Sequence, residues 1–376
     1  MVRLPIDRMA TPAYVADVAA IKHNLSVAAR IKQETGCTML LATKAFAMPA
    51  LFPMMAEVLD GTTASGLYEA RLGHEHFGGE VHAYSPAFTA KDMDALAKIC
   101  DHISFNSVAQ LEAFGGRFAH AGLRVNPRLS LVRTNSIYDP SAANSRFGVE
   151  YDALTPEVLK RISYLHVHNL CENHSDASVA LIEHMMRTLP HALDAVDYVN
   201  IGGGHYFTHP DYDIGALCHA VRHLQQTHGV RVIIESGAAH VYDAGYLVAR
   251  VVDVVQRSDV AIAVLDVSAT CHMPDVLEVP YRPHVIGDDE AHPHAYILAG
   301  NTCLTGDVIG TYHFAKQLKV GDAIIFTDMM QYSFVKNTTF NGMPLPDLAI
   351  LDEAGDYHVV KSFGYEDFAR KLCILP

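Results

Sequence analysis

The chain has 376 residues, of which half are hydrophobic and 19% are charged, and its formal net charge is −14 at pH 7. This length and balance exclude a single small domain and are typical of a soluble globular protein with a sizeable core. The acidic excess disfavours nucleic acid and anionic membranes as partners and favours a cationic substrate, although acidity also serves solubility alone.

Seven cysteines occur, an odd number, and no two of them form a Cys-x-x-Cys pair. These features argue against a disulfide framework and favour a reducing compartment. The segment from Met1 to Ala10 has no signal-peptide core. No apolar stretch approaches the ~20 residues that span a bilayer. We therefore expect a cytoplasmic protein.

Along the chain, short apolar runs alternate with stretches whose apolar residues recur at helical spacing. The runs that we interpret as strands are 38–44, 61–65, 81–85, 102–106, 123–127, 164–169, 198–203 and 231–236. Eight strands that alternate with helices over about 200 residues match a (β/α)8 TIM barrel in count and size. We expect this barrel to occupy residues 20–240.

Polar residues and a glycine run stand where these strands end. They are Lys44, Ser65, Ser85, Asn106, Asn126, His168, the run from Gly202 to Gly204, and Glu235. Because the active sites of such barrels form at the carboxyl ends of the strands, the set predicts one site on that face.

After about His240 the pattern changes to strands without long helices between them. The expected strands are 248–255, 260–267, 295–298, 307–311, 323–327 and 357–361, and residues 13–16 could add another. We therefore expect a mostly antiparallel β domain formed by residues 241–376 together with roughly 1–19.

Three of the strand ends point to one chemistry when they are combined. Lys44 lies in apolar surroundings, where a lysine loses its charge readily and its amine becomes nucleophilic. The glycine run can bring backbone N–H groups to a phosphate, and Glu235 can hold a proton on a ring nitrogen. Together they meet the requirements of a pyridoxal phosphate enzyme. Each feature alone is more often structural.

His166 and His168 support a competing interpretation. Their side chains point to one face of the strand, and with Cys171 and His174 they could form a zinc site, which would make the protein a hydrolase. His168, nearer the strand end, could instead stack on a cofactor ring.

Two further residues could act from the β domain. Cys303 lies between glycines in an expected loop, where a thiol can serve as an acid, or it is one of seven ordinary thiols. Tyr332 could donate a hydrogen bond to a phosphate, or it is a half-buried aromatic residue.

Several segments carry a family resemblance that runs almost from end to end. They include Leu41-Ala42-Thr43-Lys44-Ala45-Phe46, Cys171-Glu172-Asn173, Thr302-Cys303-Leu304-Thr305-Gly306-Asp307, Tyr332-Ser333-Phe334-Val335-Lys336 and Gly364-Tyr365-Glu366-Asp367-Phe368. With these the chain resembles the fold-type III pyridoxal phosphate decarboxylases, the group of alanine racemase and ornithine decarboxylase. Within that group it is most similar to the carboxynorspermidine/carboxyspermidine decarboxylases.

The resemblance implies pyridoxal 5'-phosphate as the cofactor, with Lys44 as the residue that holds it covalently. His168 would stack on the ring, and Glu235 would contact the pyridine nitrogen. The implied phosphate ligands are Gly203, Gly204 and Tyr332.

The resemblance also implies a homodimer with shared active sites, in which Cys303 reaches the active site of the partner subunit. Either Cys303 or Lys44 would then return the proton to the α-carbon. Asp275 and Asp307 match substrate-binding positions. The implied reaction converts carboxynorspermidine or carboxyspermidine to norspermidine or spermidine.

One departure concerns the segment after Glu235, where Ala238 replaces a second acidic residue that the family usually has there. The substrate could therefore be another basic or diamino acid. A racemase of the same fold, a cofactor carrier without turnover, and the zinc hydrolase are the remaining alternatives.

Overall fold

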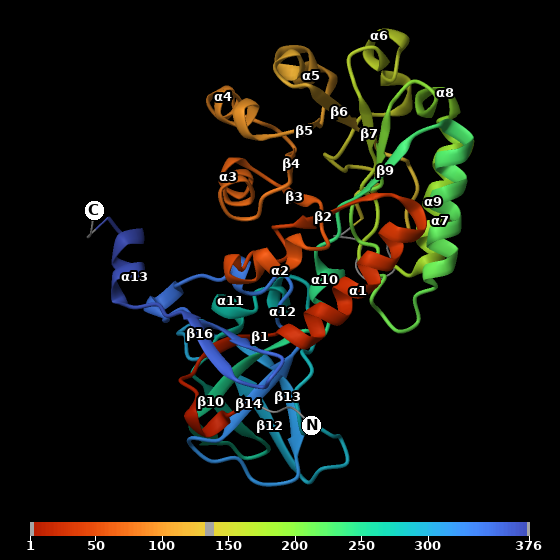
Figure 1. Cartoon of the computed structure of the whole chain (residues 1–376). Helices are drawn as coiled ribbons and strands as arrows, with labels where there is room; N and C mark the ends of the chain where they lie inside the picture. Colours follow the sequence, from red (N-terminus) through yellow and green to blue (C-terminus); the bar gives the residue numbers. More distant parts are fainter. Residues whose placement is uncertain (1–3, 132–138, 374–376) are drawn as a thin grey trace. The chain divides into compact units, whose positions relative to one another are not determined.

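The computed structural model describes residues 4–131 and 139–373. The chain forms two compact units, one of His23–His240 and one of Met1–Lys22 with Val241–Pro376. In Figure 1 the first unit contains strands enclosed by helices, and the second contains a β-sheet.

The first unit contains a closed barrel of eight parallel strands, as the sequence predicts. The strands are β2 (Thr38–Ala42), β3 (Gly61–Ala64), β4 (Glu80–Tyr84), β5 (His102–Phe105), β6 (His120–Arg124), β7 (Tyr164–His166), β8 (Tyr198–Asn200) and β9 (Arg231–Ile234). Pairing of Thr38 in β2 with Ile233 in β9 closes the barrel. The expected strand 123–127 is displaced, because after Arg124 the chain leaves the barrel ladder and Val125 pairs with Val149.

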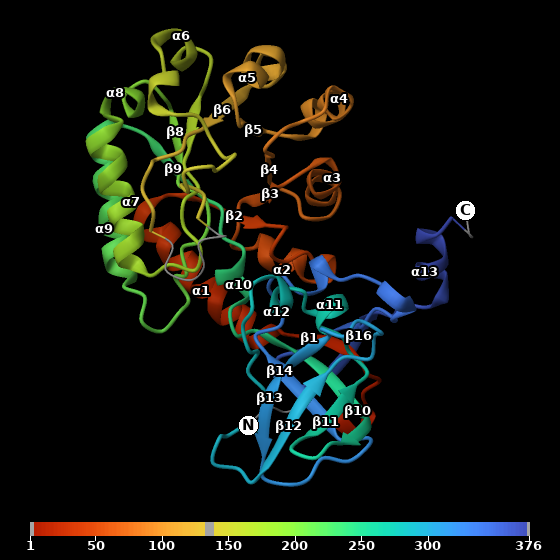
Figure 2. The same ribbon diagram turned by 180° about the vertical axis from the view of Figure 1, so that it is seen from behind.

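Helices alternate with these strands and cover the outside of the barrel (Figures 1 and 2). They are α1 (Val18–Thr35), α2 (Phe52–Ala56), α3 (Leu67–His76), α4 (Ala90–Ile99), α5 (Val108–Phe114), α6 (Pro156–Leu159), α7 (Ser175–Thr188), α8 (Pro190–Leu193), α9 (Ile214–His228) and α10 (Ala238–Val241). Helices α7 and α9 lie side by side, and both bury an apolar face.

Local sequence sets the ends of the longer helices. The side chains of Thr89, Ser107 and Asp213 accept hydrogen bonds from backbone N–H groups at the starts of α4, α5 and α9. Helix α9 ends at Gly229, whose φ of 71° is accessible to glycine at little cost. These caps fix the loops that carry the strand-end residues.

The second unit contains a sheet that runs in the order β13-β12-β11-β10-β1-β15-β16, with β14 paired to β10. Its strands are β1 (Ala13–Asp17), β10 (Gly245–Gln256), β11 (Ala261–Leu265), β12 (His294–Ala299), β13 (Val308–Phe314), β14 (Ala323–Thr327), β15 (Asp347–Leu351) and β16 (Tyr357–Lys361). Most pairs are antiparallel, as predicted, but β1–β15 and β11–β12 are parallel. The sequence did not reveal β15.

Three short helices complete the second unit, α11 (Ala269–His272), α12 (Asp275–Glu278) and α13 (Tyr365–Lys371). Its core includes Val15, Val248, Ala349 and Leu351, which come from β1, β10 and β15. The short N-terminal strand is therefore part of the sheet's interior.

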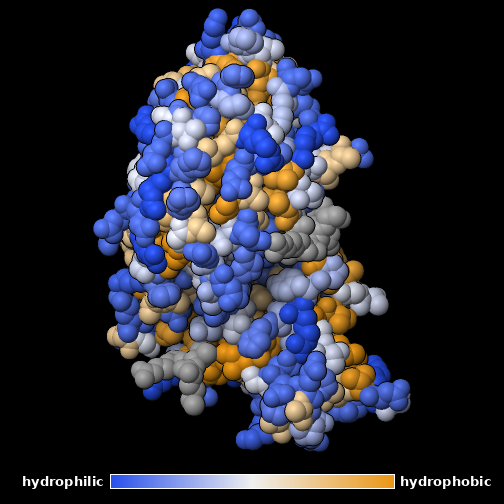
Figure 3. Space-filling model, turned by 90° about the vertical axis from the view of Figure 1, so that its right-hand side faces the viewer, coloured by the Kyte–Doolittle hydropathy of each residue, from blue (hydrophilic) through white to orange (hydrophobic). Residues whose placement is uncertain are grey.

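The outer surface of the chain is mostly polar. The face shown in Figure 3 is mainly hydrophilic, and hydrophobic residues form scattered patches on it. In the part of the chain that the structure describes, no helix is long and apolar enough to cross a membrane.

Candidate active site

A pocket opens at the carboxyl ends of the barrel strands. Its lining consists of Ala42, Lys44, Thr63, Ala64, Ser65, Tyr84, Arg124, His166, His168 and Glu235. Four of these residues, Lys44, Ser65, His168 and Glu235, belong to the set that the sequence predicts for this face. Barrel closure thus brings residues far apart in the sequence into one site.

Lys44 lies two residues after the end of β2 and lines the pocket. The side chain of Lys44 is exposed to solvent in the pocket. The protein atoms around its amine nevertheless remove part of the surrounding water and in that sense bury the amine. This burial lowers the pKa of Lys44, and the positive charge of Arg124 lowers it further, whereas Glu235 acts in the opposite direction. No hydrogen bond or ion pair within residues 4–131 and 139–373 occupies the amine. Lys44 therefore loses its proton more readily than an ordinary lysine, which favours reaction through its amine.

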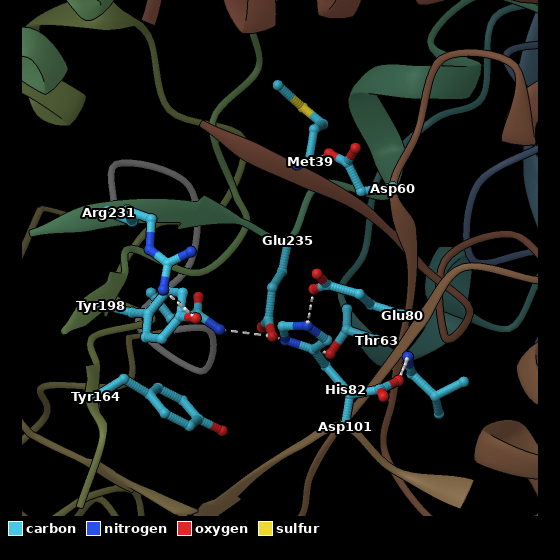
Figure 4. A network of polar contacts seen from close by, with 12 residues as sticks. Met39, Asp60, Thr63, Glu80, His82, Asp101, Tyr164, Tyr198, Arg231 and Glu235 are labelled. Atoms are coloured by element: carbon cyan, nitrogen blue, oxygen red, sulfur yellow. Dashed lines mark hydrogen bonds and ion pairs between the residues drawn. The ribbon is translucent and has the colours of Figure 1, made fainter. Parts of the chain in front are cut away.

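Glu235 is 9% exposed and is held by side chains from other strands. Its Oε1 accepts hydrogen bonds from Thr63 Oγ1 at 3.0 Å and Asn200 Nδ2 at 2.7 Å, and its Oε2 lies 3.3 Å from His166 Nε2. Figure 4 shows this carboxylate with Thr63 inside the barrel. Burial raises the pKa of Glu235, but the interactions with His166 and Asn200 outweigh it and hold that pKa well below its usual range. The site therefore contains a fixed carboxylate.

His168 lies beside the glycine run at the end of β8. The N–H of Gly203 donates to His168 Nδ1 at 2.8 Å, which places the proton of the neutral ring on Nε2. Burial lowers the pKa of His168 well below its usual value, and the charges of Lys44 and Arg124 act in the same direction. The imidazole is consequently a neutral, oriented ring.

The glycine run can only be glycine. A Cβ on Gly202 would lie 2.6 Å from the Cα of His168, and one on Gly204 would lie 2.1 Å from the carbonyl oxygen of Leu170. Gly202 and Gly204 also have positive φ angles of 70° and 82°. The N–H of Asn173, in a segment that carries the family resemblance, donates to the carbonyl oxygen of Gly204 at 2.9 Å. The run forms a close backbone cradle.

The sequence did not single out Arg124, which is 4% exposed and lines the pocket. Its guanidinium donates to the carbonyl oxygen of His168 and lies over the rings of Tyr84 and Phe147 at 4.6 and 4.5 Å. No carboxylate in the described ranges pairs with it. A buried cation without a counter-ion marks a place for an anionic group. In the sequence, Arg124 stands between Leu123 and Val125 inside an expected apolar strand, so nothing indicated that its side chain lines a pocket.

In the sheet unit, Cys303 is exposed on the loop between β12 and β13. Its N–H donates to Asn341 Oδ1 at 2.8 Å. Asp307 is buried, and its carboxylate accepts hydrogen bonds from Thr302 Oγ1 at 2.6 Å and from the N–H of Ala269 at 2.7 Å. The Asp307 carboxylate therefore shapes the loop that presents Cys303.

Asp275 begins α12 and forms an ion pair with Lys336. Lys336 also lies 2.6 Å from Glu278, so its ammonium bridges two carboxylates. Tyr332, half-buried on the segment before Lys336, has a positive φ of 51°. This arrangement is a carboxylate pair that already binds one ammonium group.

The histidines proposed for zinc do not form a group of metal ligands in the part of the chain that the structure describes. His166 Nδ1 lies 3.0 Å from Ser104 Oγ, whereas His168 Nδ1 accepts from Gly203. The ring of His174 instead lies edge-on to that of His209. Each ring serves a different partner.

Fold and pocket together define a barrel enzyme whose pocket is lined by one lysine amine and a fixed carboxylate, with a glycine run beside His168. A family model described as "Pyridoxal-dependent decarboxylase, C-terminal sheet domain" matches residues 13–330. The chain belongs to this family, and within it to the carboxynorspermidine decarboxylases, as relatives at 36% identity show. It is a pyridoxal phosphate-dependent decarboxylase. This assignment excludes the racemase, the cofactor carrier and the zinc hydrolase as interpretations of the sequence.

Two relatives and one solved structure illustrate how similar the chain is to this family. The chain is 36% identical to a carboxynorspermidine/carboxyspermidine decarboxylase of Campylobacter jejuni, covering 97% of this chain and 99% of the relative. It is also 36% identical to a carboxyaminopropylagmatine decarboxylase of Synechocystis, covering 98% and 96%. A crystal structure of C. jejuni carboxynorspermidine decarboxylase with norspermidine has a TM-score of 0.91 at 35% identity, covering 96% of this chain and 100% of that one.

Proposed function

We propose that this enzyme removes the α-carboxylate of a carboxylated polyamine such as carboxynorspermidine or carboxyspermidine, yielding norspermidine or spermidine. The observation that carries this proposal is the ammonium-binding pair of Asp275 and Glu278, found in a chain related over nearly its whole length to decarboxylases of such substrates. The net charge of −14 also suits a polycationic substrate.

The pocket residues fit pyridoxal phosphate. The Lys44 amine lacks a partner in the described chain, Arg124 lacks a counter-ion there, and the cradle excludes any Cβ. We assign Lys44 to covalent attachment, His168 to the ring face and Glu235 to the ring nitrogen. Gly204 is the better glycine candidate for the phosphate, because the N–H of Gly203 is engaged by His168. Tyr332 is a candidate phosphate ligand from the sheet unit.

Bound pyridoxal phosphate supplies an aldehyde for attachment to an amine and a ring that accepts the electron pair left by carbon dioxide. Glu235 would keep a proton on the ring nitrogen, because its carboxylate is ionised and fixed by Thr63 and Asn200. Neutral His168 would orient the ring without adding positive charge.

Cys303 is our candidate for the group that returns a proton to the α-carbon, since its thiol is exposed on an ordered loop. We propose that it acts in the active site of a second copy of this chain, in a homodimer. Asp307 acts through the loop by holding Thr302. All seven cysteines lie in the described residues and none forms a disulfide, which supports our proposal of a cytoplasmic location.

The substrate is tested by measuring carbon dioxide release from carboxynorspermidine, carboxyspermidine, carboxyaminopropylagmatine, diaminopimelate and ornithine. We expect kcat/KM for the first two to exceed that for the two amino acids at least about tenfold, since an extra ion pair contributes about 1.4 kcal/mol or more. A preference for diaminopimelate or ornithine would overturn the substrate proposal. The Lys44→Ala variant serves as the blank.

The ratio of kcat/KM for carboxynorspermidine to kcat/KM for carboxyaminopropylagmatine shows which kind of relative this enzyme resembles in its substrate. The first substrate is a carboxylated polyamine, whereas the second carries an agmatine group. Ala238, half-buried at the start of α10, stands where the family usually has an acidic residue. If that absence shapes the choice, Ala238→Glu changes this ratio. An unchanged ratio assigns the choice to other residues.

A further inference from the structure

Histidines gather at the amino-terminal end of the barrel, away from the pocket at the carboxyl ends. Glu80, His102 and His120 are the first residues of β4, β5 and β6, and His82 is the third residue of β4. None of these four side chains lines the pocket. The cluster is therefore separate from the machinery assigned above.

The rings form a stacked ladder. The centroids of His82 and His102 lie 4.3 Å apart with planes tilted by 12°, and those of His102 and His120 lie 4.6 Å apart with a tilt of 15°. Glu80 Oε2 lies 2.8 Å from His82 Nε2, a contact drawn in Figure 4. The strands that carry these residues pair directly with one another, so His82, His102 and His120 lie at neighbouring register positions.

The ladder leaves ring nitrogens unsatisfied. The Nδ1 atoms of His82, His102 and His120 are buried, and none has a hydrogen-bond partner among the described residues. Such an orphaned polar atom costs about 1–3 kcal/mol, so the neighbouring pair in His82 and His102 requires an explanation. His82 and His102 are only 1% and 4% exposed, so bulk water is not that explanation.

The rings of His82 and His102 each hold a buried nitrogen that no group in the described chain occupies. A neutral imidazole has one unprotonated nitrogen, which is the form that metals bind. One donor atom each from Glu80, His82 and His102 lies within 4.8 Å of the other two.

We propose that Glu80, His82 and His102 form a binding site for a divalent transition metal, with Zn²⁺ as the best-matched ion. Two imidazoles and one carboxylate are a ligand set that Zn²⁺ accepts, with water as a fourth ligand. Donors around zinc lie about 3.3–3.5 Å apart, given bond lengths of about 2.0–2.1 Å, so the three side chains must approach by about 1 Å. The stacked rings of His82 and His102 must also turn about their side-chain bonds until one lone pair of each points at the ion. The Glu80 side chain is 45% exposed, which leaves room for this movement and for the water.

The metal would act at the base of the barrel by joining β4 to β5. It takes no part in decarboxylation, because its ligands do not line the pocket. The expected consequence is a gain in thermal stability, since an ion that binds only the folded chain stabilises it.

The test measures Zn²⁺ binding to purified holoenzyme that has first been treated with a chelator. After addition of Zn²⁺ and gel filtration, we expect close to one zinc per chain by mass spectrometry, together with a higher melting temperature. In Glu80→Gln and in His102→Gln the affinity should fall by about tenfold or more, and the stability gain should disappear. Glu80→Gln changes a half-exposed side chain and so keeps the test valid if the buried variant fails to fold.

His358→Asn is the matched control, because His358 and Asp352 form an exposed pair at 2.9 Å that has no third ligand in a described metal group. It should bind zinc like the original chain. Absence of retained zinc in the original chain overturns the proposal, as does undiminished binding in Glu80→Gln. Loss of zinc in His358→Asn would also contradict it, because it would place the ion on the sheet unit.

Discussion

The barrel pocket and the loops of the sheet unit differ in how their functional residues are held. In the pocket, Glu235 is buried and bonded to two other strands, and His168 is fixed by Gly203. In the sheet unit, Cys303 is exposed, and Asp275 holds an ammonium group of the chain itself. The first set lies within the barrel unit and is held by its own strands, whereas Cys303 of the second set is exposed.

This contrast separates two tasks. Cofactor chemistry needs fixed charges at fixed places, which a closed barrel supplies. Substrate choice and proton return depend on side chains that must meet a molecule from outside, and the relatives differ in that substrate. We therefore expect changes in the pocket to abolish the reaction and changes in the loops to alter its rate or selectivity.

The largest effect is expected for Lys44. Both Lys44→Ala and Lys44→Arg should lower kcat by on the order of 10⁴ or more, because no other amine lines the pocket. Turnover is measured by carbon dioxide release, and circular dichroism checks the fold. Lys98→Ala, on the exposed face of α4, is the control and should keep full activity. Normal turnover by Lys44→Ala would show that the reaction does not take place in this pocket.

Glu235 should come next. Replacing the charge in Glu235→Gln should lower kcat by about 10²–10³, because the ring nitrogen loses its anionic partner. Thr63→Val removes one hydrogen bond to Oε1 and should lower kcat less than Glu235→Gln does, by about 10- to 100-fold, because a bond to a charged group contributes about 1.5–3 kcal/mol. Equal losses in the two variants would show that position rather than charge matters at Glu235.

Cys303 tests the sheet side of the comparison. Cys303→Ala should lower kcat by about 10² if the thiol donates the proton, with a smaller change in KM. Cys373 is also an exposed thiol, and Cys373→Ala should behave like the original chain. A Cys303→Ala enzyme with unchanged kcat would exclude the thiol as the donor and leave Lys44 as the candidate.

Asp275 should affect binding more than chemistry. Asp275→Asn should raise KM for a carboxylated polyamine by about tenfold, because a charge-assisted contact is lost. Glu278→Gln is matched to it, since both carboxylates bind Lys336. An increase in KM for Asp275→Asn alone indicates substrate contact. Equal increases would indicate that both residues act only by holding Lys336.

The smallest effect concerns the loss of stability at acidic pH, to which buried histidines of both units contribute. Burial lowers the pKa of His205 and His240 in the barrel, and of His272 in the sheet unit, to about 4. Below about pH 6.5 the unfolded chain takes up protons that these folded side chains do not, so the free energy of unfolding decreases as pH falls from 6.5 towards 4.

At pH 5.5 each of these histidines should lower stability by about 1.4 kcal/mol relative to neutral pH. Urea unfolding at pH 7.5 and 5.5 measures the loss of unfolding free energy between these pH values. In His272→Gln this loss should be smaller by about 1.4 kcal/mol, the contribution of one histidine. Stability that does not change between these pH values would contradict the buried, neutral state of the three rings.

The sequence predicted much of the fold because apolar runs ended by polar residues mark barrel strands directly. It failed where pairing rather than composition sets the boundary. Arg124 ends β6, but the apolar residues after it moved the expected strand three positions along the chain. Strand β15 was missed because its place depends on β1, more than 300 residues earlier.

The site divides in the same way. Lys44 and the glycine run could be found because their local sequence is unusual. Thr63 and Asn200, which fix Glu235, could not, since nothing in a buried strand shows that its residues meet across a closed barrel. The pairing of Asp275 with Lys336, 61 residues away, was equally hidden.

The central claim, that the Lys44 amine holds the cofactor, is tested most directly by chemical trapping. The purified enzyme is reduced with borohydride and digested, and the peptide that carries the pyridoxyl group is identified by mass spectrometry. The account predicts one modified residue per chain, Lys44. Modification of another lysine such as Lys336, or an active enzyme with no trapped cofactor at all, would contradict it.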